Sequence, residues 1–262
     1  SEGTLGFITE INLKLHGRPE AISAGVCTFK DLKGAIDTVI ESIQVGLPLS
    51  RIELLDEVQI KAINQYKKVS HEIGPTLFVE IQGMPLSVKE QSEIFRDIAE
   101  ANNILKFQWS DRSEEIEVLW SARHDAYYAA LALAPGKKAF TTDICVPISN
   151  LTDCIIETKK DIEQSNIIAP IVGHVGDGNF HLIMLLDPEN KKEVSEAKQL
   201  NDKLVNRALK MEGTSTGEHG IGIGKKEFLK TEQGLSVEIM SQIKKAIDPK
   251  NIMNPGKIFD IN

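Results

Sequence analysis

Apolar residues recur at helical spacing in several separate segments of the chain. Within residues 29–45 they follow the i, i+3, i+4 pattern of a single helix face: Leu32, Ala35, Ile36, Val39, Ile40 and Ile43. The same period predicts further helices over residues 58–66, 88–102, 114–133, 151–165, 189–211 and 235–247.

Short apolar runs bounded by turn residues predict the strands. The run 76–81 is rich in β-branched and aromatic residues and is ended by Gly83 and Pro85. We expect shorter strands at 52–55, 104–109 and 141–146, a β-like segment at 8–15, and two directly paired strands at 167–173 and 179–186. Helices and strands alternate, but two strands are joined directly. The pattern therefore predicts an α+β fold in which helices cover a mostly antiparallel sheet.

Composition and charge narrow the class of protein. The chain has 262 residues, 41% of them hydrophobic, and 30 Lys+Arg against 38 Asp+Glu give a net charge of −8. These proportions exclude disordered and low-complexity proteins. The acidic balance argues against nucleic acid as a partner, since phosphate-backbone binding needs a basic face. No run approaches the roughly 18–20 apolar residues of a membrane span. Three cysteines without a CxxC pair are interpreted as reduced thiols of an intracellular protein.

Histidine and glycine are concentrated in two loops. Three of the six histidines and eight of the nineteen glycines lie between Gly173 and Gly224. Glycine permits close approach of the backbone to a ligand, so loops of this composition are typical of a functional site.

The first loop carries His174 and His181 on either side of a Gly-Asp-Gly-Asn turn. On one straight strand, positions seven apart face opposite sides. A hairpin at the turn instead brings the two imidazoles together, where they suit a divalent metal such as Zn²⁺ or Mn²⁺. From the residues alone, the alternative that one histidine packs in the core and the other is solvated stays open.

The second loop carries Glu218 and His219 among four glycines. Glu218 would complete a His/His/carboxylate set that leaves coordination positions open for substrate. His219 suits a general base beside the metal, although a histidine at a helix start is the alternative. The glycines do not form a dinucleotide-binding fingerprint, because no strand leads into the loop and no acidic residue follows at the right distance.

A further candidate is Arg123, on an amphipathic helix. Arginine can hold a carboxylate by two parallel hydrogen bonds. The alternative is a surface arginine that pairs with Asp125 or Glu117.

Five segments together resemble one family. Residues 173–181 (GHVGDGNFH), 216–222 (TGEHGIG) and 253–257 (MNPGK), with 119–125 (LWSARHD) and 142–149 (TDICVPIS), are similar to the C-terminal half of FAD-dependent D-lactate dehydrogenases of the vanillyl-alcohol oxidase type, in their mitochondrial branch. Residues 1–6 (SEGTLG) resemble the end of that family's FAD-binding domain.

The resemblance implies a division of the chain into three parts. Residues 1–15 would end the FAD-binding domain, 16–250 would form the substrate- and metal-binding domain, and 251–262 would return toward the flavin. Most of the FAD would be held by a further N-terminal domain, and the chain starts at Ser1 without an initiator methionine. We therefore expect this chain alone to bind metal but to be inactive. Carried over as cofactor-binding residues are Gly3, Thr4, Gly6, Ile8 and Asn254.

The resemblance also assigns roles and a reaction. His174, His181 and Glu218 would be metal ligands, and His219 the base. Arg123, Tyr127 and Thr141 would bind substrate. The implied reaction is oxidation of D-lactate or another small D-2-hydroxy acid, with hydride passing to FAD and electrons to cytochrome c or a quinone. Thr141 stands where relatives acting on 2-hydroxyglutarate carry lysine, and Ile183 replaces a polar residue, which favours a small apolar side group.

The same residues are compatible with other functions. Within the family they are D-2-hydroxyglutarate and glycolate dehydrogenases. From other classes they are a metal hydrolase and a non-catalytic metal-binding module, which has no use for the extra base. An oligomer is compatible with the sequence.

Overall fold

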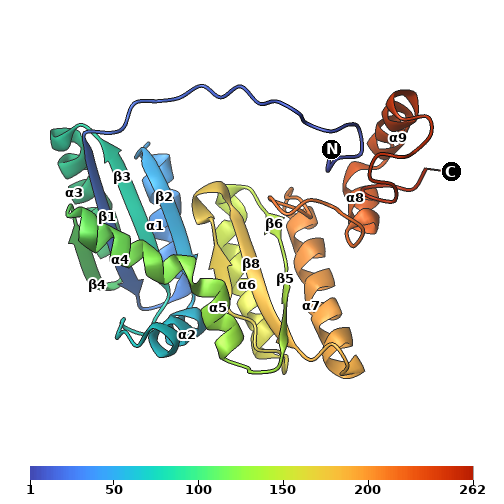
Figure 1. The fold of residues 1–262 in the computed structure, drawn as a ribbon. Helices are drawn as coiled ribbons and strands as arrows, with labels where there is room; N and C mark the ends of the chain where they lie inside the picture. Colours follow the sequence, from blue (N-terminus) through green and yellow to red (C-terminus); the bar gives the residue numbers. More distant parts are fainter. Residues whose placement is uncertain (262) are drawn as a thin grey trace.

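In the computed structural model, which describes residues 1–261, one antiparallel sheet organises the chain. The strand order is β4-β1-β3-β2-β7-β8-β5, and β6 pairs with β8 beside β5 (Figure 1). The strands are β1 (Ala21–Phe29), β2 (Leu49–Leu55), β3 (Thr76–Gly83), β4 (Ile104–Ser110), β5 (Lys138–Thr141), β6 (Ile144–Cys145), β7 (Ile171–Gly173) and β8 (Asn179–Leu186). The predicted α+β class is confirmed, and so is the direct antiparallel pairing of β7 with β8.

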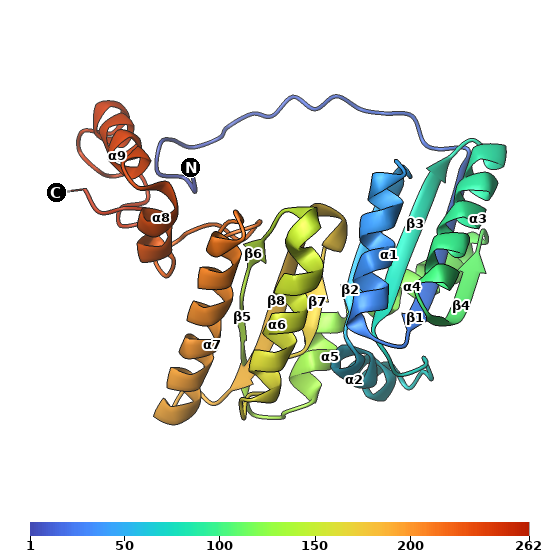
Figure 2. The ribbon, with the colours of Figure 1, turned by 180° about the vertical axis from the view of Figure 1, so that it is seen from behind.

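Helices cover both faces of the sheet. One face is covered by α1 (Leu32–Gln44), α3 (Pro85–Ala101), α6 (Leu151–Glu163) and α7 (Lys191–Lys210), which lie in front in Figure 2. The opposite face carries α4 (Ser113–His124) and α5 (Ala126–Ala132), in front in Figure 1, with α2 (Glu57–Lys67) at its lower end. Two short 3₁₀ turns span Ile148–Asn150 and Val175–Asp177. No helix within residues 1–261 is both long and apolar enough to cross a bilayer.

The last two helices pack apart from the sheet. α8 (Lys226–Gln233) and α9 (Ser236–Ile247) share a small apolar cluster with the chain's end, including Ile221 and Phe259. The first residues of the chain lie against this cluster, and an extended segment then crosses to β1 (Figures 1 and 2). The predicted β-like segment 8–15 lies in this crossing. It forms no strand, because it has no neighbouring strand to pair with, and its apolar side chains are exposed.

Four elements differ from the predicted pattern. β1 and α8 were not predicted from the sequence, and two predicted elements are interrupted. The helix expected over 114–133 breaks at Asp125, whose carboxylate pairs with Lys67 of α2. The strand expected over 141–146 is split into β5 and β6. Between them the Thr142 hydroxyl accepts the Leu182 N–H at 2.9 Å, and Asp143 turns toward the Gly-rich loop.

The alternation of side chains along each strand determines on which face of the sheet the polar residues of the candidate site lie. Phe180, Leu182 and Met184 of β8 belong to the core under α1, α6 and α7. Ile183 and Leu185 belong to the core under α4 and α5, and His181 has their parity. In β2, Glu53 likewise has the parity of Leu55, which packs in that second core. His181 and Glu53 therefore share the face that α4 covers.

Candidate active site

The hairpin brings the two histidines of the first loop together. β7 ends at Gly173, the turn Val175–Asp177 follows, and Gly178 closes it with φ 78°, a conformation that favours glycine. The ring centroids of His174 and His181 lie 5.7 Å apart. The predicted approach of these side chains is confirmed.

Each of these imidazoles has one nitrogen occupied and one free. His181 Nδ1 lies 2.9 Å from the carbonyl oxygen of Thr142, and its Nε2 is buried without a partner. His174 Nδ1 lies 2.7 Å from Glu53 Oε1. Each Nδ1 therefore donates a proton to an oxygen, and in the neutral imidazole each Nε2 has the lone pair that a metal requires.

The second loop places Glu218 opposite both free nitrogens. Glu218 Oε1 lies 3.2 Å from His181 Nε2 and 3.4 Å from His174 Nε2. His219 Nε2 lies 3.4 Å from the same oxygen, and its ring stacks on that of His181 at 4.7 Å and 3°. The side chains singled out in the two loops thus meet at one point.

The spacing of His174, His181 and Glu218 fits a metal. Tetrahedral Zn²⁺ with bonds of about 2.0–2.1 Å holds neighbouring ligand atoms about 3.3 Å apart, close to the two separations found. All three donor atoms lie within 4.8 Å of one another. Burial lowers the pKa of His181, which favours its neutral, ligating form. The hydrogen bond with Glu53 raises the pKa of His174.

A second group, Asp143, His181 and His219, is equally compact but does not fit a metal as well. Asp143 Oδ1 accepts from Asn179 Nδ2 at 2.8 Å. Asp143 Oδ2 accepts from the backbone N–H of His219 at 2.9 Å and from the Thr216 hydroxyl at 2.7 Å. Its oxygens are therefore already occupied.

Asp143 instead holds the second loop in place. The N–H of Glu218 also points at its carboxylate, and Lys225 Nζ lies 3.3 Å from Oδ2. Burial alone would raise the pKa of Asp143, but the donors from His219, Thr216 and Asn179 hold that pKa well below its usual range. The sequence analysis gave Asp143 no role, and its only local signal is an acidic residue directly before an apolar strand.

Arg123 is paired, but with neither of the acids considered from the sequence. Its Nε and Nη2 lie 3.0 and 2.8 Å from Glu53 Oε2. Glu53, which the sequence analysis also missed, therefore contacts both Arg123 and His174.

Thr141 and Tyr127 are placed differently. Thr141 is the β-sheet partner of Ile183, two residues beyond His181 on the same face. Tyr127 lies half-exposed on α5, and its ring contacts Tyr128 at 5.7 Å. No described hydrogen bond links Tyr127 to the histidines.

Only some of the residues predicted to bind the cofactor lie close together. Gly3 lies beside Asn254, whose Nδ2 donates to the carbonyl of Glu2. The Glu2 carboxylate accepts the N–H groups of Ile221 and Gly222 at 2.7 and 2.8 Å, a contact that the sequence analysis did not foresee. Thr4 is buried in the same turn, whereas Gly6 and Ile8 are exposed on the extended segment.

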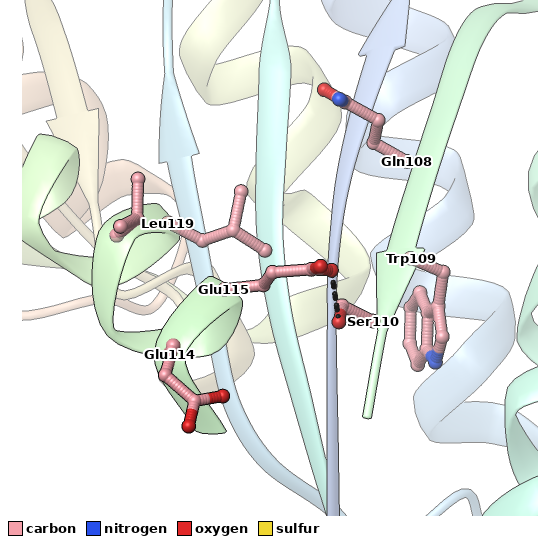
Figure 3. Close-up of a pocket in the computed structure, with 7 residues that line it drawn as sticks. Gln108, Trp109, Ser110, Glu114, Glu115 and Leu119 are labelled. Atoms are coloured by element: carbon pink, nitrogen blue, oxygen red, sulfur yellow. Dashed lines mark hydrogen bonds between the residues drawn. The ribbon is translucent and has the colours of Figure 1, made fainter. Parts of the chain in front are cut away.

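Two hollows lie on or near this face of the sheet. One of about 290 Å³ borders the site and is lined by residues that include Arg51, Glu53 and His174. Another, of about 400 Å³, lies between β4 and α4 and is mostly apolar (Figure 3). There Glu115 accepts the Ser110 hydroxyl at 2.6 Å, and no histidine is present. The second hollow is therefore not part of the candidate site.

The fold that carries this cluster is that of a known protein family. The model of FAD-linked oxidases, C-terminal domain, matches residues 18–258, and the chain belongs to this family. Solved structures with a similar fold include 4-ethylphenol oxidase from Gulosibacter chungangensis (TM-score 0.72, 16% identity, 95% of this chain and 55% of that one). Another is p-cresol methylhydroxylase (TM-score 0.66, 14% identity, 93% and 54%).

Relatives of higher identity carry more specific names. The chain is 47% identical over its whole length to a probable mitochondrial D-lactate dehydrogenase of Danio rerio, covering 53% of it. It is 42% identical to the mitochondrial D-lactate dehydrogenase (cytochrome) of Arabidopsis thaliana, over 99% of this chain and 46% of that one. It is 30% identical to the glycolate oxidase subunit GlcD of Bacillus subtilis, over 99% and 55%. The chain thus spans about half the length of these curated relatives.

Proposed function

We propose that this chain is the substrate- and metal-binding part of a FAD-dependent enzyme that oxidises D-lactate, or a similarly small D-2-hydroxy acid, to the 2-oxo acid. The observation that carries the proposal is the convergence of His174, His181 and Glu218, with His219 stacked beside them. The names of the relatives at 42–47% identity point to the same substrate.

The residues divide the work by their surroundings. His174, His181 and Glu218 hold a divalent cation, Zn²⁺ or Mn²⁺, because the two Nε2 atoms and one carboxylate oxygen face a common point. When bound, the cation supplies Lewis acidity toward the substrate hydroxyl and the flavin supplies the hydride acceptor. Gly3, Thr4 and Asn254, with Gly6 and Ile8 further along the chain, are the residues that would approach the flavin.

His219 is the base that takes the hydroxyl proton. Asp143 fixes the His219 backbone at 2.9 Å, and the ring stacks on His181, so Nε2 is held beside the ligand set. The side chain is nevertheless partly exposed, as a group that must meet a substrate has to be.

Substrate is held on the same face by Arg123 and by the wall near Thr141. The Arg123 guanidinium binds the substrate carboxylate. Thr141 pairs in register with Ile183, so the wall beside His181 is short and carries no cation of its own. Such a wall suits a methyl group better than a second carboxylate. Tyr127 stays a candidate for the outer rim.

Glycolate is the second candidate substrate. It is favoured by the 30% identity to the GlcD subunit and by the weak discrimination of apolar walls among small side groups. The names of these relatives favour a mitochondrial enzyme that passes electrons to a cytochrome. A quinone is the alternative acceptor.

The proposal is tested by comparing a variant of a proposed metal ligand, His181, with a variant of the proposed base, His219. Titration of Zn²⁺ or Mn²⁺ into the chain should show one site that His181→Ala abolishes and His219→Ala retains. His16→Ala, on the exposed N-terminal segment, is the control. In the complete enzyme both site variants should lose D-lactate turnover. Equal loss of metal in both variants would contradict the division of roles, and faster turnover of glycolate than of D-lactate would favour the second candidate.

A further inference from the structure

One carboxylate, that of Glu53, lies between the proposed metal ligand His174 and the proposed substrate-binding Arg123. Its oxygens are divided between them. Oε1 lies 2.7 Å from His174 Nδ1, and Oε2 lies 3.0 and 2.8 Å from Arg123 Nε and Nη2. The Glu53 side chain is 13% exposed, so these contacts are largely shielded from water.

We propose that Glu53 is a positioning residue that sets the tautomer of His174 and the orientation of Arg123 at the same time. The proposal rests on the function proposed above and adds to it a physical link between the metal site and the carboxylate-binding arginine. Three separate elements meet at Glu53, which lies on β2: Arg123 lies in the last turn of α4, and His174 directly follows β7.

Glu53 acts on His174 by fixing which ring nitrogen carries the proton. A carboxylate can only accept, so His174 carries a hydrogen on Nδ1. The neutral, ligating imidazole then has its lone pair on Nε2, the atom that faces Glu218. The neutral carbonyl oxygen of Thr142 fixes the same tautomer in His181, because it also accepts a hydrogen bond from Nδ1. A charged acceptor forms the stronger bond and makes the ligating nitrogen more basic.

Glu53 orients Arg123 by occupying one of the two hydrogen-bonding edges of its guanidinium group. Glu53 occupies the side formed by Nε and Nη2. The free edge is the end formed by Nη1 and the second hydrogen of Nη2, and no described hydrogen bond reaches Nη1. A substrate carboxylate would therefore bind Arg123 end-on, in a direction that Glu53 determines.

A purely structural role is the competing explanation, since the ion pair also ties α4 to the sheet. Glu53→Gln separates the two. The glutamine oxygen has to face Arg123, because an amide NH₂ there would meet only donors. The NH₂ then faces His174 Nδ1, which becomes an acceptor, and the proton moves to Nε2, where it blocks the metal. A structural contact alone would leave the tautomer unchanged.

The experiment uses this chain and two readouts. Imidazole ¹⁵N NMR reports the tautomer of His174, and titration with Zn²⁺ alone reports affinity. Glu53→Gln should shift the His174 proton from Nδ1 to Nε2 and weaken Zn²⁺ binding by about 10–100-fold, as loss of such partners of metal ligands does elsewhere. Asp161→Asn is the matched control, because Asp161 is also an arginine-paired carboxylate, 17% exposed. It lies on α6 and pairs with Arg207 of α7, on the opposite face of the sheet from Glu53.

The outcomes are distinguishable. An unchanged tautomer with Zn²⁺ affinity within twofold of the parent overturns the role of Glu53, while leaving the metal site intact. A parent chain that binds no Zn²⁺ or Mn²⁺ contradicts the proposed function, and the NMR readout still decides whether Glu53 controls His174. If Glu53→Gln does not fold, Glu53→Asp keeps the charge and shortens the reach. It should preserve the Nδ1–H tautomer with an intermediate loss of affinity, and full parental affinity would overturn the proposal.

Discussion

The buried carboxylate of Asp143 should decide whether the loop carrying Glu218 and His219 stays ordered. Asp143→Asn keeps the size of the side chain but removes its charge and converts one oxygen into a donor. Both oxygens of Asp143 now accept from neighbouring donors, including the N–H groups of Glu218 at 3.1 Å and His219 at 2.9 Å. Whichever way the amide turns, its NH₂ faces a donor.

The free energy of stabilisation that the loop loses can be worked out from these contacts. A hydrogen bond to a charged group contributes about 1.5–3 kcal/mol and a neutral one about 0.5–1.5, so two retained backbone bonds lose about 1 kcal/mol each. A buried donor left without a partner adds about 1–3 kcal/mol. The total is about 3–5 kcal/mol, and it is lost from the loop, not from the sheet.

Amide hydrogen exchange is the direct assay, because the weakened hydrogen bonds are those of the Glu218 and His219 amides themselves. At about 1.4 kcal/mol per factor of ten, both should exchange at least about 100-fold faster in Asp143→Asn than in the parent. Thr216→Val removes one donor to the same carboxylate but keeps the charge that the Glu218 and His219 amides meet, so it should raise exchange clearly less than Asp143→Asn does. Parental protection of both amides in Asp143→Asn would refute this account of the loop.

Three further substitutions test other contacts. Gly25→Ala would place a methyl group 1.9 Å from a ring atom of Trp109, so it should lower the free energy of unfolding in urea by about 1–3 kcal/mol. Arg123→Lys in the complete enzyme keeps the charge but loses the two-pronged contact. The KM for D-lactate should rise about 10–100-fold, and an unchanged KM would remove Arg123 from the substrate site. Gly220→Ala at φ 82° would also place Cβ 2.8 Å from Glu2 Oε1, and the melting temperature should fall by a few degrees.

Local patterns predicted most elements but not the residues that support the site. The helices at 32–44 and 191–210 and the β7–β8 hairpin follow from periodicity and turn chemistry, which act over a few residues. β1 was missed because alanine, serine and glycine are weak strand formers. Gly25 is required there by the ring of Trp109 on the neighbouring strand, 84 positions along the chain.

The supporting carboxylates were missed for the same reason. Glu53 contacts Arg123 and His174 at separations of 70 and 121 residues, and Asp143 contacts the N–H of His219 at 76. Nothing near either acid in the sequence marks these partners. The ligand candidates were found because glycines and histidines cluster in two loops, whereas a supporting acid has only the ordinary surroundings of its strand.

Glu218 and Asp143 are both acids of the same site, and their surroundings predict opposite effects of the same change. The Asp143 carboxylate is fully buried and occupied by donors, whereas Glu218 is 49% exposed and its Oε1 meets only imidazole nitrogens. Glu218→Gln should therefore leave the melting temperature within about 1 °C of the parent and abolish measurable Zn²⁺ binding, because an amide oxygen is a far weaker ligand for this cation. Asp143→Asn should show the opposite order, with loop protection lost first and metal affinity reduced as a consequence. Calorimetric melting and Zn²⁺ titration of the two variants side by side provide the measurement. A Glu218→Gln chain that melts early but still binds Zn²⁺ would mean that Glu218 belongs to the support of the loop and not to the ligand set.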